Sequence, residues 1–153
     1  MTYAADTTVP AERSRSEIEA LLRKHGATSI ASGWDEQYAA IQCRINDRIL
    51  RFRVPMPLRN DHLKDGRGRT RTQAQITNAV AQTERSRWRA LMLVIKAKLE
   101  SVESGIESFE QAFLAHFVLP SGETVGDWAS VELEHVYRTN TMPTSMLSLS
   151  SGL

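Results

Sequence analysis

Apolar and polar side chains alternate along two segments in the first third of the chain, residues 38–45 and 48–54. An alternation with period two is typical of a strand that buries one face. The Asn46-Asp47 pair between the segments is typical of a short turn. The side chains that share the apolar face are Ala39, Ile41, Cys43, Ile45, Leu50, Phe52 and Val54. Together with a shorter strand at 28–33, the pattern predicts a three-stranded antiparallel meander.

Helical spacing replaces this alternation on either side of the predicted sheet. One helix is predicted to begin at the capping residue Ser14 and to end at Gly26. A long helix is predicted over residues 73–104, followed by two shorter helices capped by Ser108 and Thr124. The apolar seam of the long helix consists of Trp88, Leu91, Met92, Ile95, Leu99, Val102 and Ile106. We expect this seam to pack on the apolar face of the sheet. The order predicts an α+β fold: an N-terminal helix, a three-stranded antiparallel meander, a long helix and two shorter C-terminal helices.

Length and composition fit one folded domain. The chain has 153 residues, of which 41% are hydrophobic and 24% charged, and a chain of this size normally folds as one unit. We expect a single α+β domain over residues 14–138, between a flexible N-terminus at 1–13 and a flexible tail at 139–153. Residues 58–72 are polar and rich in arginine, and they follow two prolines that end the sheet. They are expected to form a mobile basic loop.

The net charge of +1 conceals a strong segregation of charge along the chain. Residues 41–100 hold fourteen basic and five acidic side chains, whereas residues 101–153 hold one basic and seven acidic side chains. A basic middle segment predicts an anionic partner. The alternative is neutralisation within the protein, in which the acidic C-terminal third folds onto the basic middle or onto another subunit.

Arginine is concentrated on the polar face of the predicted hairpin, in the loop and at the start of the long helix. A guanidinium group binds phosphate through parallel N–H donors, so we expect nucleic acid or another phosphate-bearing ligand as a partner. The predicted phosphate-binding residues are Arg44, Arg51, Arg53, Arg67, Arg69, Arg71, Arg85 and Arg89. The alternative is an ordinary solvated sheet face beside a disordered loop, in a chain whose arginine content reflects a GC-rich genome.

Nothing in the sequence matches a common catalytic or cofactor motif. The four histidines are scattered, the chain has one cysteine, and no glycine-rich phosphate loop is present, so we expect no metal and no cofactor. The strand pattern places Cys43 on the apolar face, where it fits a buried side chain better than a nucleophile. We assign no catalytic residue, and an enzyme is the less favoured interpretation. No apolar run reaches the roughly 18 residues of a membrane span, and the expected location is the cytoplasm of a bacterium or of an infected host cell.

Several stretches together resemble a group of short phage and prophage proteins without an assigned activity. The stretches are Trp88 to Leu91, Val94 to Glu100, Val102 to Ile106, Phe109-Glu110, Phe113 to Ala115, Val118 to Trp128 and Met142-Pro143. The resemblance covers most of residues 14–143, with the helix ending at Gly26 and the hairpin ending at Pro57. It implies a viral or prophage origin, and a role in replication, recombination, host takeover or evasion of defence. It brings no catalytic residues with it.

The sequence therefore predicts a non-catalytic phage or prophage accessory protein that binds nucleic acid through a basic sheet face and an arginine-rich loop. One alternative is an anti-defence protein that captures a host protein or a nucleotide signal. Another is a structural or assembly protein. A homo-oligomer is expected, because a three-stranded sheet and one long helix leave edges and faces that self-association would cover.

Overall fold

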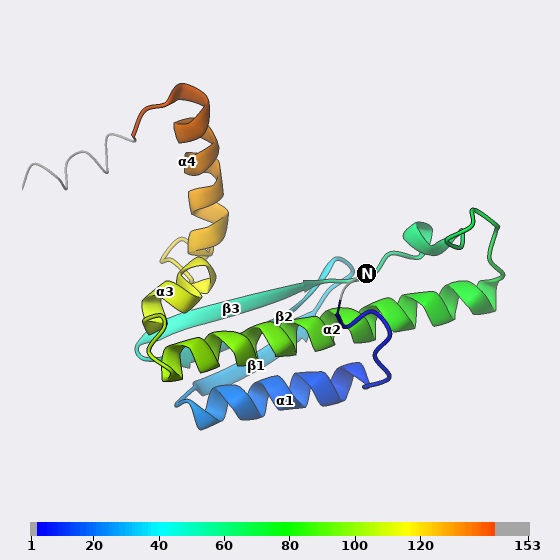
Figure 1. Cartoon of the computed structure of the whole chain (residues 1–153), viewed down its shortest axis with the longest axis horizontal. Helices are drawn as coiled ribbons and strands as arrows, with labels where there is room; N and C mark the ends of the chain where they lie inside the picture. Colours follow the sequence, from blue (N-terminus) through cyan, green and yellow to red (C-terminus); the bar gives the residue numbers. More distant parts are fainter. Residues whose placement is uncertain (1–2, 143–153) are drawn as a thin grey trace, which may run out of the picture.

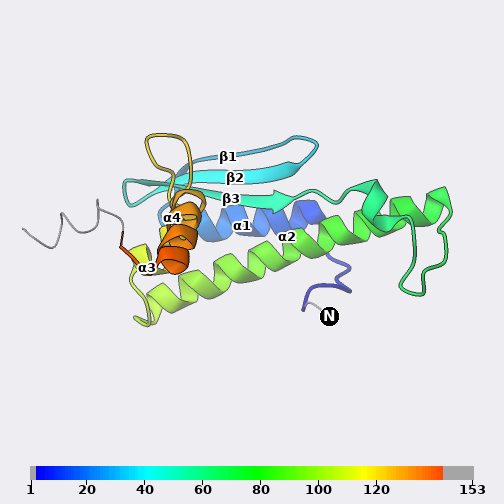
Figure 2. The same ribbon diagram turned by 90° about the horizontal axis from the view of Figure 1, so that it is seen from above.

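Two helices cover one face of a three-stranded antiparallel sheet in the computed structural model, which describes residues 3–142 (Figure 1). The sheet has the order β1 (Thr28–Trp34), β2 (Tyr38–Ile45), β3 (Arg48–Pro55). Helices α1 (Ala11–Lys24) and α2 (Gln73–Glu103) lie side by side beneath it. Figure 2 shows the same two layers from above, with the strands on one side of the helices. The predicted α+β fold is confirmed.

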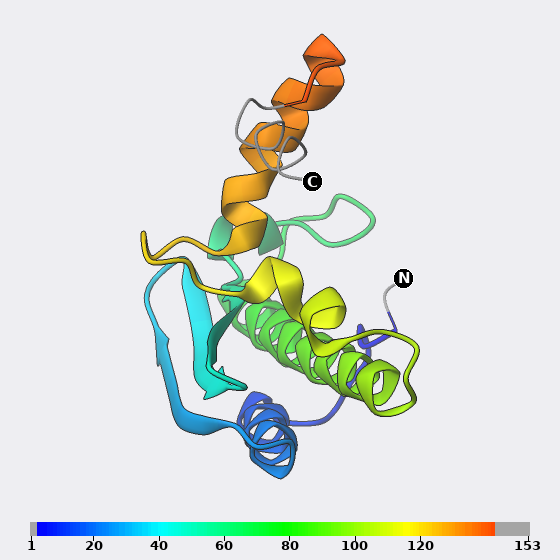
Figure 3. The same ribbon diagram turned by 90° about the vertical axis from the view of Figure 1, so that its left-hand side faces the viewer.

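The C-terminal third adds two helices at one end of the sheet. Helix α3 (Phe109–Phe113) and the short 3₁₀ turn η2 (Leu114–His116) pack against the end of α2 and β3. Helix α4 (Val125–Thr139) stands away from the rest of the molecule, as Figure 3 shows. Residues 143–153 lie outside the described residues, and with them most of the predicted tail.

The alternation along β2 and β3 produces the predicted apolar face. Ile41 lies opposite Phe52 and Cys43 opposite Leu50 in the antiparallel register, and each of these side chains is at most 1% exposed. The connecting Asn46 and Asp47 both have positive φ angles, 47° and 59°. Two left-handed residues match the right-handed twist of a two-residue hairpin, and asparagine and aspartate tolerate that conformation.

The seam of α2 fills the space beneath the apolar face. Trp88, Met92, Ile95 and Leu99 are buried with the strand residues in one core. Ile106, which the spacing placed in the same seam, is 77% exposed, and this part of the prediction is wrong. The helix ends at Glu103, and Gly105 adopts a φ of 72° that turns the chain away from the core.

Helix α1 begins four residues earlier than the capping pattern indicates, with Pro10 rather than Ser14 at the cap position. It starts at Ala11, and the carbonyl of Pro10 accepts hydrogen bonds from the backbone N–H groups of Arg13 and Ser14. Ser14 therefore lies inside the helix rather than at its cap. Its hydroxyl is fully buried and has no hydrogen-bond partner within the described part of the chain.

We expect Ser14→Ala to stabilise the protein by about 1 kcal/mol, because burying a hydroxyl without a partner costs roughly that much or more. The free energy of unfolding from a urea titration measures the change. Ser16→Ala is the matched control, since Ser16 lies on the same helix, is exposed and gains the same helix propensity. Equal effects of the two substitutions would show that the buried hydroxyl carries no cost.

The arginine-rich loop folds back along the first turns of α2 and reaches beyond the end of the sheet (Figure 2). It contains the 3₁₀ turn η1 (Arg59–His62) and an isolated bridge between Lys64 and Thr70. The Asp65 carboxylate accepts the backbone N–H groups of Arg67 and Arg69 at 2.9 Å each, which lowers the pKa of Asp65. These contacts give the loop a defined shape, and its mobility in solution stays a prediction.

Candidate phosphate-binding surfaces

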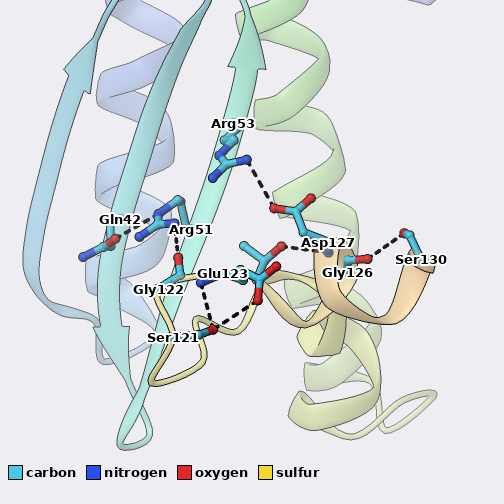
Figure 4. Close-up of polar contacts among 10 residues, drawn as sticks. Gln42, Arg51, Arg53, Ser121, Gly122, Glu123, Gly126, Asp127 and Ser130 are labelled. Atoms are coloured by element: carbon cyan, nitrogen blue, oxygen red, sulfur yellow. Dashed lines mark hydrogen bonds and ion pairs between the residues drawn. The ribbon is translucent and has the colours of Figure 1, made fainter. Parts of the chain in front are cut away.

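The polar face of the sheet is partly covered by the C-terminal third of the chain. Arg51 donates from Nε to Oε1 of Gln42 at 3.1 Å and from Nη1 to the carbonyl of Gly122 at 2.8 Å (Figure 4). Arg53 pairs with Asp127 through Nη1 and Oδ2 at 3.2 Å, and its guanidinium lies 6.0 Å from the centre of the Tyr38 ring. The two arginines therefore hold the base of α4 onto the sheet.

A tight turn brings the acidic segment to these arginines. The backbone N–H of Val118 donates to the carbonyl of Ile49 at 2.8 Å, so the chain runs for a short distance beside β3. Leu119 then accepts a hydrogen bond from the backbone N–H of Gly122, which has a φ of 90°. Thr124 is buried and accepts the backbone N–H of Asp127 as the cap of α4.

The contact between Arg53 and Asp127 pairs one basic residue of the middle segment with one acidic residue of the C-terminal third. It is an example of the neutralisation within the protein that the segregation of charge suggested as an alternative. Arg53 is compensated by a carboxylate, whereas both partners of Arg51 are uncharged. Arg44 lies on the same face and is exposed. The signal for the contact was present in the sequence as an acidic C-terminal third beside a basic middle, but nothing in the pattern paired Arg53 with Asp127.

The two predicted arginines of α2 lie away from the polar sheet face. Arg89 donates from Nη1 to Glu17 of α1 at 2.7 Å, and this bond lowers the pKa of the Glu17 carboxyl. Arg85 donates to the side chain of Gln82, whose amide nitrogen binds the carbonyls of Ala5 and Thr7 in the segment before α1. Arg89 therefore joins α2 to α1, and Arg85 supports the Gln82 side chain that binds the N-terminal segment.

The loop arginines form a separate group at the far end of α2. Arg71 donates to the carbonyl of His62 at 3.2 Å, and Arg69 pairs with Asp65 at 3.0 Å. Arg67 is exposed. A groove of about 500 Å³ opens between this loop and α2. It is lined by Asp65, Arg69, Thr70, Arg71, Gln75, Asn78 and Ala79.

Two further arginines, one in the loop and one on α2, hold the loop and the end of β3 against α2. Arg59 donates to Thr77 at 3.1 Å and to Gln73 at 2.9 Å, and Arg87 donates to the carbonyl of Pro55. We call residues 59–71 and the turns of α2 at 73–87 the basic end of the molecule. It holds seven basic and three acidic side chains, a net charge of +4.

Burial shifts the pKa values of two titratable groups that pack in or against the core. Burial raises the pKa of the Cys43 thiol to about 11, so the thiol stays protonated at neutral pH, and a thiol rather than a thiolate is a poor nucleophile. Burial and the nearby Lys98 lower the pKa of His116, whose ring packs on Phe52 with centroids 4.6 Å apart. In residues 3–142, no three histidine, cysteine, aspartate or glutamate side chains gather where they could hold a metal ion.

The eight predicted arginines thus occupy three separate surfaces: the polar sheet face, the contact of Arg89 with α1, and the basic end, which includes Arg85. Across the described ranges, no helix has the length and apolar character that a membrane span requires. Comparison with protein-family models, curated proteins and solved structures finds no match to this chain.

Proposed function

We propose that this protein binds the phosphate backbone of nucleic acid through its basic end. The proposal rests on which groups accept hydrogen bonds from the arginines of the basic end. Among the described residues, Arg59 and Arg87 donate to neutral side chains or backbone carbonyls, so these hydrogen bonds orient the guanidinium groups without cancelling their charge. Arg71 also donates to a carbonyl, but its charge acts on Asp65 and helps to lower the pKa of that carboxyl. The net charge of +4 at the basic end attracts a polyanion, which releases its counterions on binding.

The basic end offers charge but no stacking groups. The sequence has no phenylalanine, tyrosine or tryptophan between Phe52 and Trp88. Binding of single strands usually relies on aromatic side chains that stack on unpaired bases. Contacts to phosphates alone carry no sequence information. These features favour a double-stranded ligand that is bound without regard to its sequence.

The polar sheet face is the weaker part of the original hypothesis. Arg51 and Arg53 hold the base of α4, so a phosphate at this position would have to displace Gly122 and Asp127. The proposal therefore places the ligand at the loop and the start of α2. A phage or prophage origin and a cytoplasmic location remain predictions of the sequence that accompany this proposal.

Removal of two exposed cations from the basic end should weaken binding to every sequence alike. Lys64 and Arg67 are exposed, and the internal hydrogen bonds of the described loop do not use their side chains. We expect Lys64→Ala/Arg67→Ala to reduce the slope of log K against log salt by about 1.4–1.8, since each lost phosphate contact contributes about 0.7–0.9. The measurement is a titration of labelled single- and double-stranded DNA and RNA at several salt concentrations.

The control removes the same charge from another surface. Arg13 and Arg23 are exposed on α1, and Arg13→Ala/Arg23→Ala should leave the salt slope close to that of the wild type. An equal change in both double variants would mean that net charge alone governs binding. A loss confined to Arg51→Ala/Arg53→Ala would return the site to the sheet face. Absence of binding by the wild type at low salt would reject the proposal and favour capture of a host protein or a nucleotide.

A further inference from the structure

Helix α4 exposes large apolar side chains around its circumference, and the rest of the described chain leaves them uncovered. Trp128, Val131, Leu133 and Tyr137 are 42%, 68%, 53% and 83% exposed, and α4 has no buried residue. The whole helix is roughly 22 Å long at 1.5 Å per residue. Its base is fixed to the sheet, and most of its length extends into solvent (Figures 1 and 3). An isolated helix of this length is marginally stable in water. A surface that buries its apolar side chains would therefore stabilise it.

A matching surface lies between α1 and α2. A groove of about 340 Å³ has Leu21, Met92 and Leu93 among its lining residues, together with Lys24 and Lys96. Both lysines are exposed, and the lining also contains Arg89 paired with Glu17, so the groove combines apolar side chains with a net positive charge. The helix α4 has the complementary character, since it combines apolar residues with three carboxylates and one arginine.

We propose that α4 of one molecule docks into the α1–α2 groove of a second copy of this chain. The groove of the same molecule is out of reach, because α4 rises on the side opposite to α1 (Figure 3). An amphipathic helix bound in an apolar groove is a recurrent mode of recognition between proteins. Opposite charge favours this pairing over contact between two α4 helices, which would bring two acidic surfaces together.

Glu132 is the acidic residue of α4 that we expect to contact the groove. It lies one helical turn from Trp128 and one turn from Val136, so all three share a face, and its side chain is half-buried. Glu134 is exposed and lies about half a turn away, on the opposite face with Tyr137, which the proposed contact through Trp128 and Val136 leaves uncovered. In the docked state the Glu132 carboxylate would meet Lys24 or Lys96.

Sedimentation velocity of the full chain over a wide concentration range, with nucleic acid removed, tests the proposal. We expect the wild type to self-associate and Glu132→Lys to raise the dissociation constant by about tenfold or more, because like charges across an interface are strongly unfavourable. Lys96→Glu should weaken association as well, and the combination of the two should restore it. Glu134→Lys is the matched control and should have little effect.

Three results would overturn the proposal. The wild type could remain monomeric at all concentrations, Glu132→Lys and Glu134→Lys could weaken association equally, or association could persist unchanged in both Glu132→Lys and Lys96→Glu. Circular dichroism of each variant tests whether the fold is kept, which we expect because the substituted side chains lie outside the core. The variants leave the basic end unchanged, so nucleic-acid binding and self-association can fail independently.

Discussion

Phe52→Ala is expected to lower the free energy of unfolding by about 3–5 kcal/mol, the usual cost of removing a fully buried aromatic side chain. Phe52 is 0% exposed, and its ring meets Phe113 edge to face with centroids 6.1 Å apart. It also packs on His116. One side chain therefore joins the sheet to the C-terminal helices, and truncation would leave a cavity between the two parts.

A loss of this size is a large fraction of the total stability of a small domain, about 5–15 kcal/mol. A urea titration followed by circular dichroism measures it. Tyr38→Ala is the control, since Tyr38 is an aromatic residue of the same sheet on the polar face, 43% exposed. We expect it to cost about 1 kcal/mol or less. An unchanged urea midpoint for Phe52→Ala would mean that the core lies elsewhere.

Gly126→Ala is expected to destabilise the protein by about 1–3 kcal/mol, the usual cost of overpacking. A Cβ at Gly126 would lie 2.9 Å from the carbonyl oxygen of Ala115 and 3.3 Å from its Cβ. The clash involves backbone, which cannot rotate away as a flexible side chain would. It outweighs the gain in helix propensity, roughly 1 kcal/mol, that alanine normally brings over glycine.

The same substitution should loosen the base of α4, because Gly126 lies next to the Asp127 that pairs with Arg53. The free energy of unfolding and the fluorescence of Trp128 report the global and the local effect. Gly66→Ala is the control, since a Cβ there would meet nothing within 4 Å. Equal stability of both variants would show that the start of α4 can shift away from Ala115 at no cost.

The periodicity of apolar residues was sufficient to predict the helices, the strands and most core residues. It was not sufficient to predict where each helix begins and ends. The alternation in β2 and β3 defined the buried face, because side chains two positions apart on a strand, such as Leu50 and Phe52, lie on the same side of the sheet. The start of α1 was missed, since the Ser14–Glu17 spacing imitates a cap and Pro10 begins the helix without one. Ile106 was assigned to the seam because the spacing continues past Gly105, where the helix has already ended.

The sequence predicted which residue type dominates the candidate site, but only part of how those side chains are arranged in space. The sequence singled out arginine, but a linear pattern does not show that Arg89 turns toward Glu17 on another helix or that Arg53 meets Asp127. These are contacts between residues more than 70 positions apart. The local contacts of the loop, such as those of Asp65 with Arg67 and Arg69, follow from short spacings of the kind that turn patterns capture.

The part of α2 that extends beyond the sheet can accept sequence changes more easily than the part that packs on it. Ile76 is the one buried residue of α2 between Gln73 and Arg87 in the described structure. Substitutions at exposed positions of this stretch change stability by about 0.5 kcal/mol or less, so the basic end can gain, lose or reverse charge while the core stays folded. Selection can therefore change the charge of this end at little cost to the stability of the core.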